Sequence, residues 1–314
     1  MFNPSDQTNI FDHAVPLVSR HGLLLVRLDV HSASVRSVVF NRELLAVCNL
    51  VTGKFDVLPW LIHSFGVNLD ETGYAILTAT DCLSSNDIDE QEQQLPLFKV
   101  LVISICQLTR SYHLHTFSSG GELRWNTCSG YVGGGITSKA LRQHNAVVCR
   151  RMAHWLFEKA SSLYTLDVSA KTGQVFFTEV SIRLCGAEYD GLYLTADKEG
   201  RLTLLQLQRD GLQLKMWRLH DNGELIDMNP QVLQLKHPYQ QKEIHGVVYT
   251  YLGETSGTLL MKDNHGHVYA ADVKTGVVHE VTGWPRRCNM SRKKTVPLEM
   301  DWPAFLVSRL GIAK

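Results

Sequence analysis

The chain has 314 residues, of which 44% are hydrophobic and 20% charged, and its 31 basic residues balance 31 acidic ones. These proportions are typical of a globular protein, and the zero net charge gives no overall field that would favour nucleic acid or a membrane surface. The apolar runs "GLLLV" and "VLVISIC" are far shorter than the roughly 20 residues of a membrane-spanning helix, and the polar start "MFNPSDQTN" lacks the regions of a signal peptide. We therefore expect an intracellular protein, cytoplasmic or nuclear.

The seven cysteines are an odd number and include no CxxC pair, which argues against a disulfide framework and against a zinc finger. Cys48, Cys106 and Cys149 lie in or end apolar, strand-like runs. Free cysteine packs as a small hydrophobic residue. We expect these three thiols to be buried and unreactive.

Residues 1–12 form a polar segment, and residues 13–314 are predicted to form one all-β domain. Three stretches of this domain, "AVCNLVTGKFDVL", "YTLDVSAKTGQVFF" and "YAADVKTGVVHEV", each place a Thr-Gly pair between two apolar runs. This pattern predicts a β-hairpin whose glycine, Gly53, Gly173 or Gly276, adopts positive φ. A side chain before each turn is expected to accept backbone N–H bonds; the three are Asn49, Asp167 and Asp272.

Four looser hairpin patterns bring the total to at least seven: "HTFSSGGELRW", "YLTADKEGRLTLLQL", "MWRLHDNGELIDM" and "LLMKDNHGHVYAADV". The Thr-Gly turns lie about 100 to 120 residues apart, which fits two to three units of the ~40 to 50 residues of a propeller blade. The prediction is a β-propeller of about six to seven blades. A series of β-sandwiches is the alternative architecture, but no Pro/Gly/Ser linker divides the chain.

Two further segments interrupt this pattern. Residues 84–94, "SSNDIDEQEQQ", lie between two strand-like runs and are expected to be a long, solvated hairpin loop. The carboxylates of this loop lack the glycine and the terminal glutamate of an EF-hand, so a calcium site is not favoured. The segment "DWPAFLVSRLG", residues 301–311, is the single helix that we predict, with Asp301 as its cap and Gly311 at its end.

His113 and His115 have the period-two spacing of a strand face, and His265 and His267 have the same spacing at what we expect to be a polar hairpin tip. A metal site would need further ligands at a recognisable spacing, and none follows, so we predict no metal and no cofactor. The run "GYVGGGITS" lacks the Gly-Lys-Ser/Thr of a phosphate loop, and no serine, histidine and acid form a triad by spacing. No catalytic residue is predicted.

The basic run "PRRCNMSRKKT", which spans Arg286 to Lys294, has no interleaved aromatic residues of the kind that stack on nucleic-acid bases. It is interpreted as a solvated turn.

Trp155, in "AHWLF", either packs between two blades or lines the central channel. Packing is favoured, because a buried indole removes about 150–250 Å² from water.

Several phrases resemble the F-box-associated β-propellers of plants. "AVVCRRMAHWLF" followed by "LDVSAKTG" is similar to the middle of that domain, and "HAVPLVSRHGLLLVRL", "VCNLVTGKFDVLPWL" and "PLEMDWPAFLVSRLGI" are similar to its start, its first hairpin and its closing segment. The resemblance marks His154, Trp155, Asp167 and Gly173 as signature positions for interaction or structure. Leu50 stands where the family usually has proline, Arg151-Met152 replaces the usual glycine, and no F-box precedes residue 13 in this sequence.

The resemblance implies a protein-interaction module that selects an unknown protein substrate for a ubiquitin ligase, with a Skp-type adaptor and a cullin as partners only when an F-box is attached. It implies no chemistry of its own. The alternative is a propeller enzyme, a glycosidase or lyase, which would need two carboxylates close together at the channel mouth. The candidates are Asp81, Asp167, Glu179, Asp190 and Asp272.

Overall fold

The computed structural model describes residues 14–28, 42–64, 67, 71–82, 97–133, 136–160, 162–182, 191–197, 199–208, 213–220, 223–226, 229–236, 248–255, 257–282 and 298. Within these residues the chain is all-β apart from one short helix, α2 (Ala79–Cys82). No helix in the described part is long and apolar enough to cross a bilayer.

The strands form five antiparallel sheets, each made of strands that follow one another in the chain. Blade 1 contains β1 (Val15–Arg20), β2 (Leu23–Leu28), β3 (Arg42–Asn49), β4 (Phe55–Val57) and β5 (Leu61–Ile62). Blade 2 contains β6 (Gly73–Thr78), β7 (Phe98–Cys106), β8 (Ser111–Ser118) and β9 (Asn126–Tyr131). Blade 3 contains β10 (Ile136–Leu141), β11 (Val147–Cys149), β12 (Met152–Lys159), β13 (Ser162–Ser169) and β14 (Val175–Val180).

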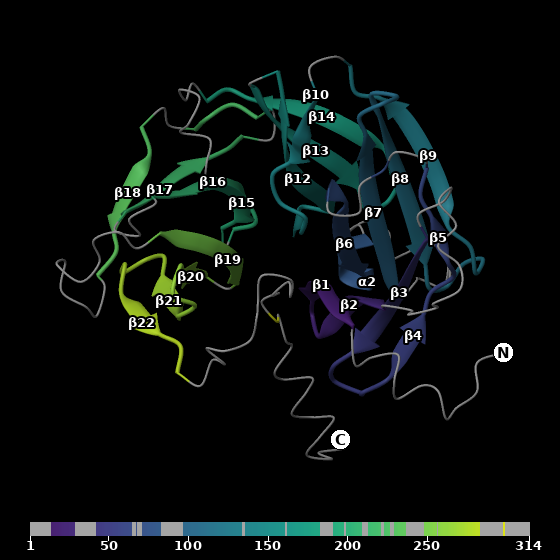
Figure 1. Ribbon diagram of the computed structural model, residues 1–314, viewed down its shortest axis with the longest axis horizontal. Helices are drawn as coiled ribbons and strands as arrows, with labels where there is room; N and C mark the ends of the chain where they lie inside the picture. Colours follow the sequence, from purple (N-terminus) through teal and green to yellow (C-terminus); the bar gives the residue numbers. More distant parts are fainter. Residues whose placement is uncertain are drawn as a thin grey trace, which may run out of the picture.

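Blade 4 contains β15 (Leu192–Ala196), β16 (Leu202–Leu207), β17 (Gln213–Arg218) and β18 (Gln231–Gln234). Blade 5 contains β19 (Tyr249–Thr255), β20 (Thr258–Asp263), β21 (Val268–Asp272) and β22 (Val278–Glu280). Figure 1 shows the five sheets around a common centre, with β1, β6, β12, β15 and β19 nearest to it and β4, β9, β18 and β22 at the periphery. This radial arrangement confirms the all-β propeller.

The described residues form five blades, fewer than the six to seven that the sequence predicted. The overestimate arises because two hairpin patterns often share one sheet. "YLTADKEGRLTLLQL" supplies β15 and β16 of blade 4, and "MWRLHDNGELIDM" supplies β17 of the same blade. A hairpin pattern marks a turn between strands, and it cannot show whether the next strand joins the same sheet or begins another.

The three Thr-Gly turns have the predicted backbone geometry. Gly53, Gly173 and Gly276 have φ values of 73°, 71° and 70°. Asn49 Oδ1 accepts the backbone N–H groups of Val51 and Thr52, both at 3.0 Å.

The predicted role of Asp167 at its turn is wrong, whereas that of Asp272 is right. Asp272 Oδ1 accepts from the backbone N–H groups of Lys274 and Thr275 at 2.9 and 2.7 Å. In blade 3 the equivalent position, four residues before the glycine, is Ser169, whose Oγ accepts the N–H of Thr172 at 3.2 Å. Asp167 lies two residues earlier, inside β13, and its carboxylate binds other strands.

Trp155 lies between blades 2 and 3, as the packing alternative predicted. It is fully buried in an apolar cluster that includes Leu77 and Leu101 of blade 2 and Leu166 of blade 3. Its indole Nε1 donates to the backbone oxygen of His144 at 3.3 Å. A Cβ atom at Gly73 would lie 2.5 Å from that Nε1 atom. Only glycine at this position therefore lets β6 lie this close to the Trp155 ring.

Three predicted segments lie outside the described residues: the loop 84–94, the basic run 286–294 and the helix 301–311. The strands that flank the loop, β6 and β7, pair as an antiparallel hairpin from Gly73↔Ile103 to Thr78↔Phe98. That pairing agrees with the predicted connection across residues 84–94.

Candidate functional site

A cavity of ≈ 1690 Å³ lies among the innermost strands of the propeller. Its wall is formed by β1, by residues 142–150 before and along β11, by β15, by parts of β16, β17 and β19, and by the turn 272–274. Side chains of blades 1, 3, 4 and 5 therefore meet at one place, and Ile76 adds a contact from blade 2. From the sequence, Asp272 was named as a candidate site residue and Cys149 as a buried thiol, but their place in a common wall was not predicted.

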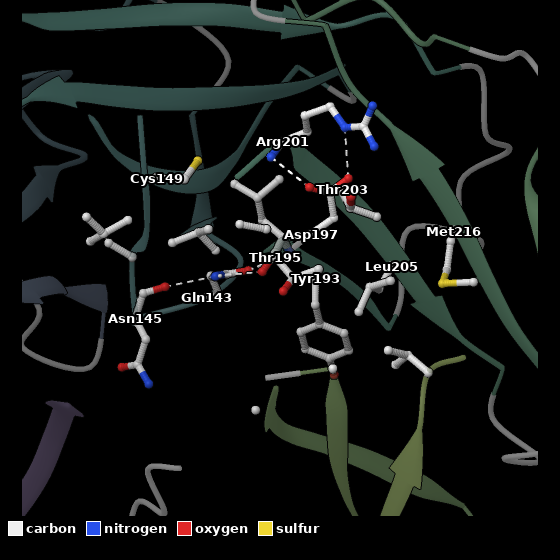
Figure 2. Close-up of a pocket in the computed structure, with 18 of the residues that line it drawn as sticks. Gln143, Asn145, Cys149, Tyr193, Thr195, Asp197, Arg201, Thr203, Leu205 and Met216 are labelled. Carbon is white, nitrogen blue, oxygen red and sulfur yellow. Dashed lines mark hydrogen bonds and ion pairs between the residues drawn. The ribbon is translucent and has the colours of Figure 1, made fainter. Parts of the chain in front are cut away.

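Gln143 fastens blade 3 to blade 4 in the wall of this cavity (Figure 2). Its Oε1 accepts the backbone N–H of Leu194 at 2.7 Å, and its Nε2 donates to the backbone oxygen of Asn145 at 2.8 Å. The amide is thus used on both ends, so Gln143 holds the wall rather than presenting a polar group to a ligand.

Two tyrosines from different blades form an aromatic part of the wall. Tyr193 of β15 and Tyr251 of β19 stack with their ring centroids 3.8 Å apart and their planes at 24°. Leu205 and Met216 also line the cavity, and Figure 2 shows both on the same side of it as Tyr193. The cavity therefore has a mixed apolar and polar wall that can contact aromatic or aliphatic groups of a partner.

The described carboxylates of the cavity wall are hydrogen-bonded. Asp197 Oδ1 accepts the backbone N–H groups of Glu199 and Arg201, each at 2.9 Å, and its Oδ2 accepts from Arg201 Nε at 2.9 Å. Burial opposes ionisation of Asp197, but these hydrogen bonds outweigh it and lower the carboxyl pKa. Arg201 also pairs with Glu199 at 2.6 Å.

Asp272 is held in the same manner. Its pKa is lowered by hydrogen bonds from the backbone and hydroxyl of Thr275 and from the backbone of Lys274. A general acid needs a raised carboxyl pKa, which neither Asp197 nor Asp272 has.

The carboxylates proposed for an enzyme do not gather at the cavity. Of the four that the structure describes, Asp272 alone lines it. Asp81 accepts Arg20 Nε and Nη2 at 2.8 and 2.6 Å, a bidentate pair that joins blade 1 to the end of β6. Glu179 is exposed on the outer strand β14, and Asp190 lies outside the described residues.

The four signature positions lie in blade 3, and none lines the cavity. His154 and Asp167 are cross-strand partners, with His154 Nδ1 2.7 Å from Asp167 Oδ1. Trp155 points to the opposite face of β12 and is buried against blade 2. Gly173 forms the tip of the turn between β13 and β14.

The histidines His113 and His115 belong to β8. His115 is buried, and its ring meets the His63 ring edge-on with the centroids 5.6 Å apart. His63 Nε2 lies 3.0 Å from Glu43 Oε2, and the Tyr74 hydroxyl donates to Glu43 Oε1 at 2.7 Å. This buried polar group between blades 1 and 2 was missed by sequence analysis, because its members are distant in the chain.

No group of three or more His, Cys, Asp or Glu side chains suited to a metal ion occurs within the described ranges. His265 and His267 lie at the polar turn between β20 and β21, as predicted. There the Asp263 carboxylate accepts both of their backbone N–H groups, at 2.9 and 2.8 Å.

No protein-family model matches this chain, and no curated protein matches it. Among solved structures, a protein from Lactobacillus plantarum is 12% identical with a TM-score of 0.43, over 85% of this chain and 70% of that one. A protein of unknown function from Bacteroides caccae is 12% identical with a TM-score of 0.37, over 76% and 69%. An exo-β-1,3-galactanase from Phanerochaete chrysosporium is 10% identical with a TM-score of 0.34, over 67% and 49%. Likenesses this distant carry no argument about function.

Proposed function

We propose that this protein is a non-enzymatic interaction module, the substrate-recognition propeller of an F-box-type ubiquitin ligase receptor or of a relative of such receptors. It binds a protein partner at the mouth of the central cavity. The observation that carries this proposal is the cavity itself, where side chains of several blades meet around a mixed apolar and polar wall. Loops and strand ends that converge in this way can vary without disturbing the sheets, which suits recognition.

The state of the cavity carboxylates supports binding over hydrolysis. A glycosidase pairs a protonated carboxyl group with an ionised one. Here both Asp197 and Asp272 have lowered pKa values. Asp197 accepts from two backbone N–H groups and from Arg201 Nε, and Asp272 Oδ1 accepts from Lys274 and Thr275. A carboxylate that is already hydrogen-bonded and ionised is poorly suited to protonate a leaving group.

The assignment to the F-box-associated propellers is supported by the sequence stretches around His154, Trp155 and Asp167. In blade 3 these residues make a buried pair and an inter-blade contact. The stacked Tyr193 and Tyr251 rings supply the aromatic surface that a protein partner uses most often.

Recruitment to a ligase tests the family assignment. The 314-residue chain alone is expected not to co-purify with a Skp-type adaptor, because its blades bury their apolar strands against each other and a stable interface needs at least about 1,000 Å². The same chain fused behind a functional F-box should co-purify with the adaptor and the cullin. Stoichiometric binding of the adaptor by the unfused chain would contradict this assignment.

A charge reversal at the cavity tests the binding site. Arg218 is exposed and lines the cavity, whereas Arg124 is exposed in blade 2 away from it. Proteins ubiquitinated through the F-box fusion, quantified by mass spectrometry, should be lost with Arg218→Glu and retained with Arg124→Glu. Equal substrate sets for the two variants would place recognition elsewhere, and turnover of a glycoside panel would contradict the non-enzymatic function.

A further inference from the structure

A row of polar side chains crosses blade 3 on one face of the sheet. Asp167 of β13 is the centre of this row: its Oδ1 lies 2.7 Å from His154 Nδ1, and its Oδ2 accepts the hydroxyl groups of Thr165 and Thr178 at 3.0 and 2.8 Å. Cys149 of β11 continues the row. Val147↔His154 and Cys149↔Met152 are cross-strand partners, so the side chains of Cys149 and His154 are diagonal neighbours on this face.

The thiol end of this row is at the central cavity. Cys149 ends β11, which pairs only with β12 in this sheet, and it lines the cavity wall (Figure 2). Its exposed fraction is 8%. A void of ≈ 1690 Å³ beside it has room for many molecules the size of water, so a small reagent can reach a thiol that larger molecules cannot.

The same order of thiol, imidazole and carboxylate occurs in enzymes with a cysteine nucleophile. There the imidazole activates the sulfur, and the carboxylate orients the imidazole. Burial alone would favour a neutral His154. The hydrogen bond to the Asp167 carboxylate, with a further contribution from Cys149, outweighs burial and raises the His154 pKa to about 9. An imidazolium ion beside a thiol favours reaction at the sulfur.

We propose that Cys149 is a covalent modification site, where the sulfur reacts with small electrophiles that enter the central cavity, hydrogen peroxide in particular. The sulfur attacks one peroxide oxygen, an S–O bond forms and the O–O bond breaks. The thiol proton passes to the hydroxide that leaves, so the products are a sulfenic acid and water, with sulfur oxidised and peroxide reduced by two electrons.

This proposal replaces, for Cys149, the expectation of an unreactive buried thiol. The other described cysteines provide internal controls. Burial raises the thiol pKa of Cys48 and Cys128. Burial also raises that of Cys82, a change that Lys99 opposes and Asp81 assists. Cys128 is the exposed member of this set, so accessibility alone predicts that it reacts first.

The experiment treats the intact chain with hydrogen peroxide, traps sulfenic acid with dimedone and measures the rate at each cysteine by peptide mass spectrometry. Cys149 should react about tenfold faster in the native chain than in the urea-denatured chain, and faster than native Cys128. A native rate at Cys149 equal to or below the denatured rate would overturn the proposal. This comparison needs no variant.

Two variants then test the role of the imidazole. His154→Gln, verified as folded by circular dichroism, should lower the Cys149 rate about tenfold and leave the Cys128 rate unchanged. The matched control, His265→Gln in the exposed turn of blade 5, should alter neither rate. An unchanged Cys149 rate in a folded His154→Gln variant would overturn the proposal; if that variant does not fold, the native and denatured wild-type rates decide.

Discussion

Blades 2 and 3 each bury one histidine on a strand that pairs with neighbours on both sides, β8 and β12, and the two imidazoles differ in charge. His115 of blade 2 is 3% exposed and His154 of blade 3 is 8% exposed, so burial is nearly the same. Burial, together with repulsion from His63 and His113, lowers the His115 pKa to about 4. His154 experiences the same burial, but Asp167 and Cys149 raise its pKa to about 9.

The difference lies in the hydrogen-bond partner. His115 Nδ1 faces the hydroxyl of Thr127 at 2.9 Å, and a hydroxyl group serves a neutral ring well. His154 Nδ1 faces a carboxylate at 2.7 Å, which serves a charged ring better. The comparison shows that the neighbouring residue, and not the depth of burial, decides the charge of a buried histidine in this sheet.

The two histidines therefore give the folded state opposite responses to pH. An unfolded histidine has a pKa near 6.5. The raised pKa of His154 adds stability that is fully present below about pH 6.5 and is lost as the pH rises through about 9. The lowered pKa of His115 adds stability that is present above about pH 6.5 and is lost as the pH falls toward 4.

The largest expected effect comes from a residue that does not titrate. Trp155→Ala should lower the free energy of unfolding by about 3–5 kcal/mol, the usual cost of removing a large buried aromatic side chain. Because no charge changes, urea denaturation at pH 5, 7 and 9 should show the same loss. A loss below about 1 kcal/mol would contradict the inter-blade role of Trp155.

Asp167→Asn should remove the charge of His154 and destabilise the chain by about 1.5–3 kcal/mol at pH 6.5, the range for hydrogen bonds to charged groups. The difference from wild type should shrink as the pH rises to 9, because wild type loses its own ion pair there. Urea denaturation across this pH range measures it. A difference that stays constant with pH would contradict a charged His154.

His115→Gln should reduce the loss of folding stability that wild type shows as the pH falls below about 6.5. Between pH 6.5 and 5, wild type should lose about 2 kcal/mol through the His115 group, since one pKa unit corresponds to about 1.4 kcal/mol. The variant should lose less over the same interval, and its behaviour between pH 6.5 and 9 should match wild type. His265→Gln is the control, because His265 is exposed in the turn between β20 and β21 of blade 5, away from His115.

The smallest expected effect comes from the acidic loop. Replacing residues 84–94 by a short Gly-Ser turn should change the melting temperature little, because four carboxylates and four amides offer little apolar area to offset the entropy of ordering. The acid response should persist in this variant, since it belongs to His115 and not to the loop carboxylates. A large fall in melting temperature would show that the loop packs on the propeller.

Local features of this fold could be predicted from the sequence. A Thr-Gly turn depends on four or five adjacent residues, and Gly53, Gly173 and Gly276 adopt the predicted φ. The error at Asp167 was also local: both Asp167 and Ser169 can accept a backbone N–H, and only the register of β13 shows that Ser169 is at the turn.

Features that join distant segments could not be predicted. His63 and His115 are 52 positions apart, and Gly73 and Trp155 are 82 apart, yet each pair is in contact. Their contacts depend on which blades are neighbours, and a hairpin pattern contains no information about neighbours. The cavity wall was missed for the same reason, because all five described blades contribute to it.

Each sheet in the described chain is built from consecutive strands, and this has a consequence for synthesis. A ribosome releases the chain from its N-terminal end at about 5–20 residues per second, and every blade has all of its strands once its own segment has emerged. Blade 1 can thus pair its strands before blade 5 has been translated, and each new blade has a finished sheet to pack against. The propeller can assemble in the order of translation, because each sheet needs only strands that are consecutive in the chain.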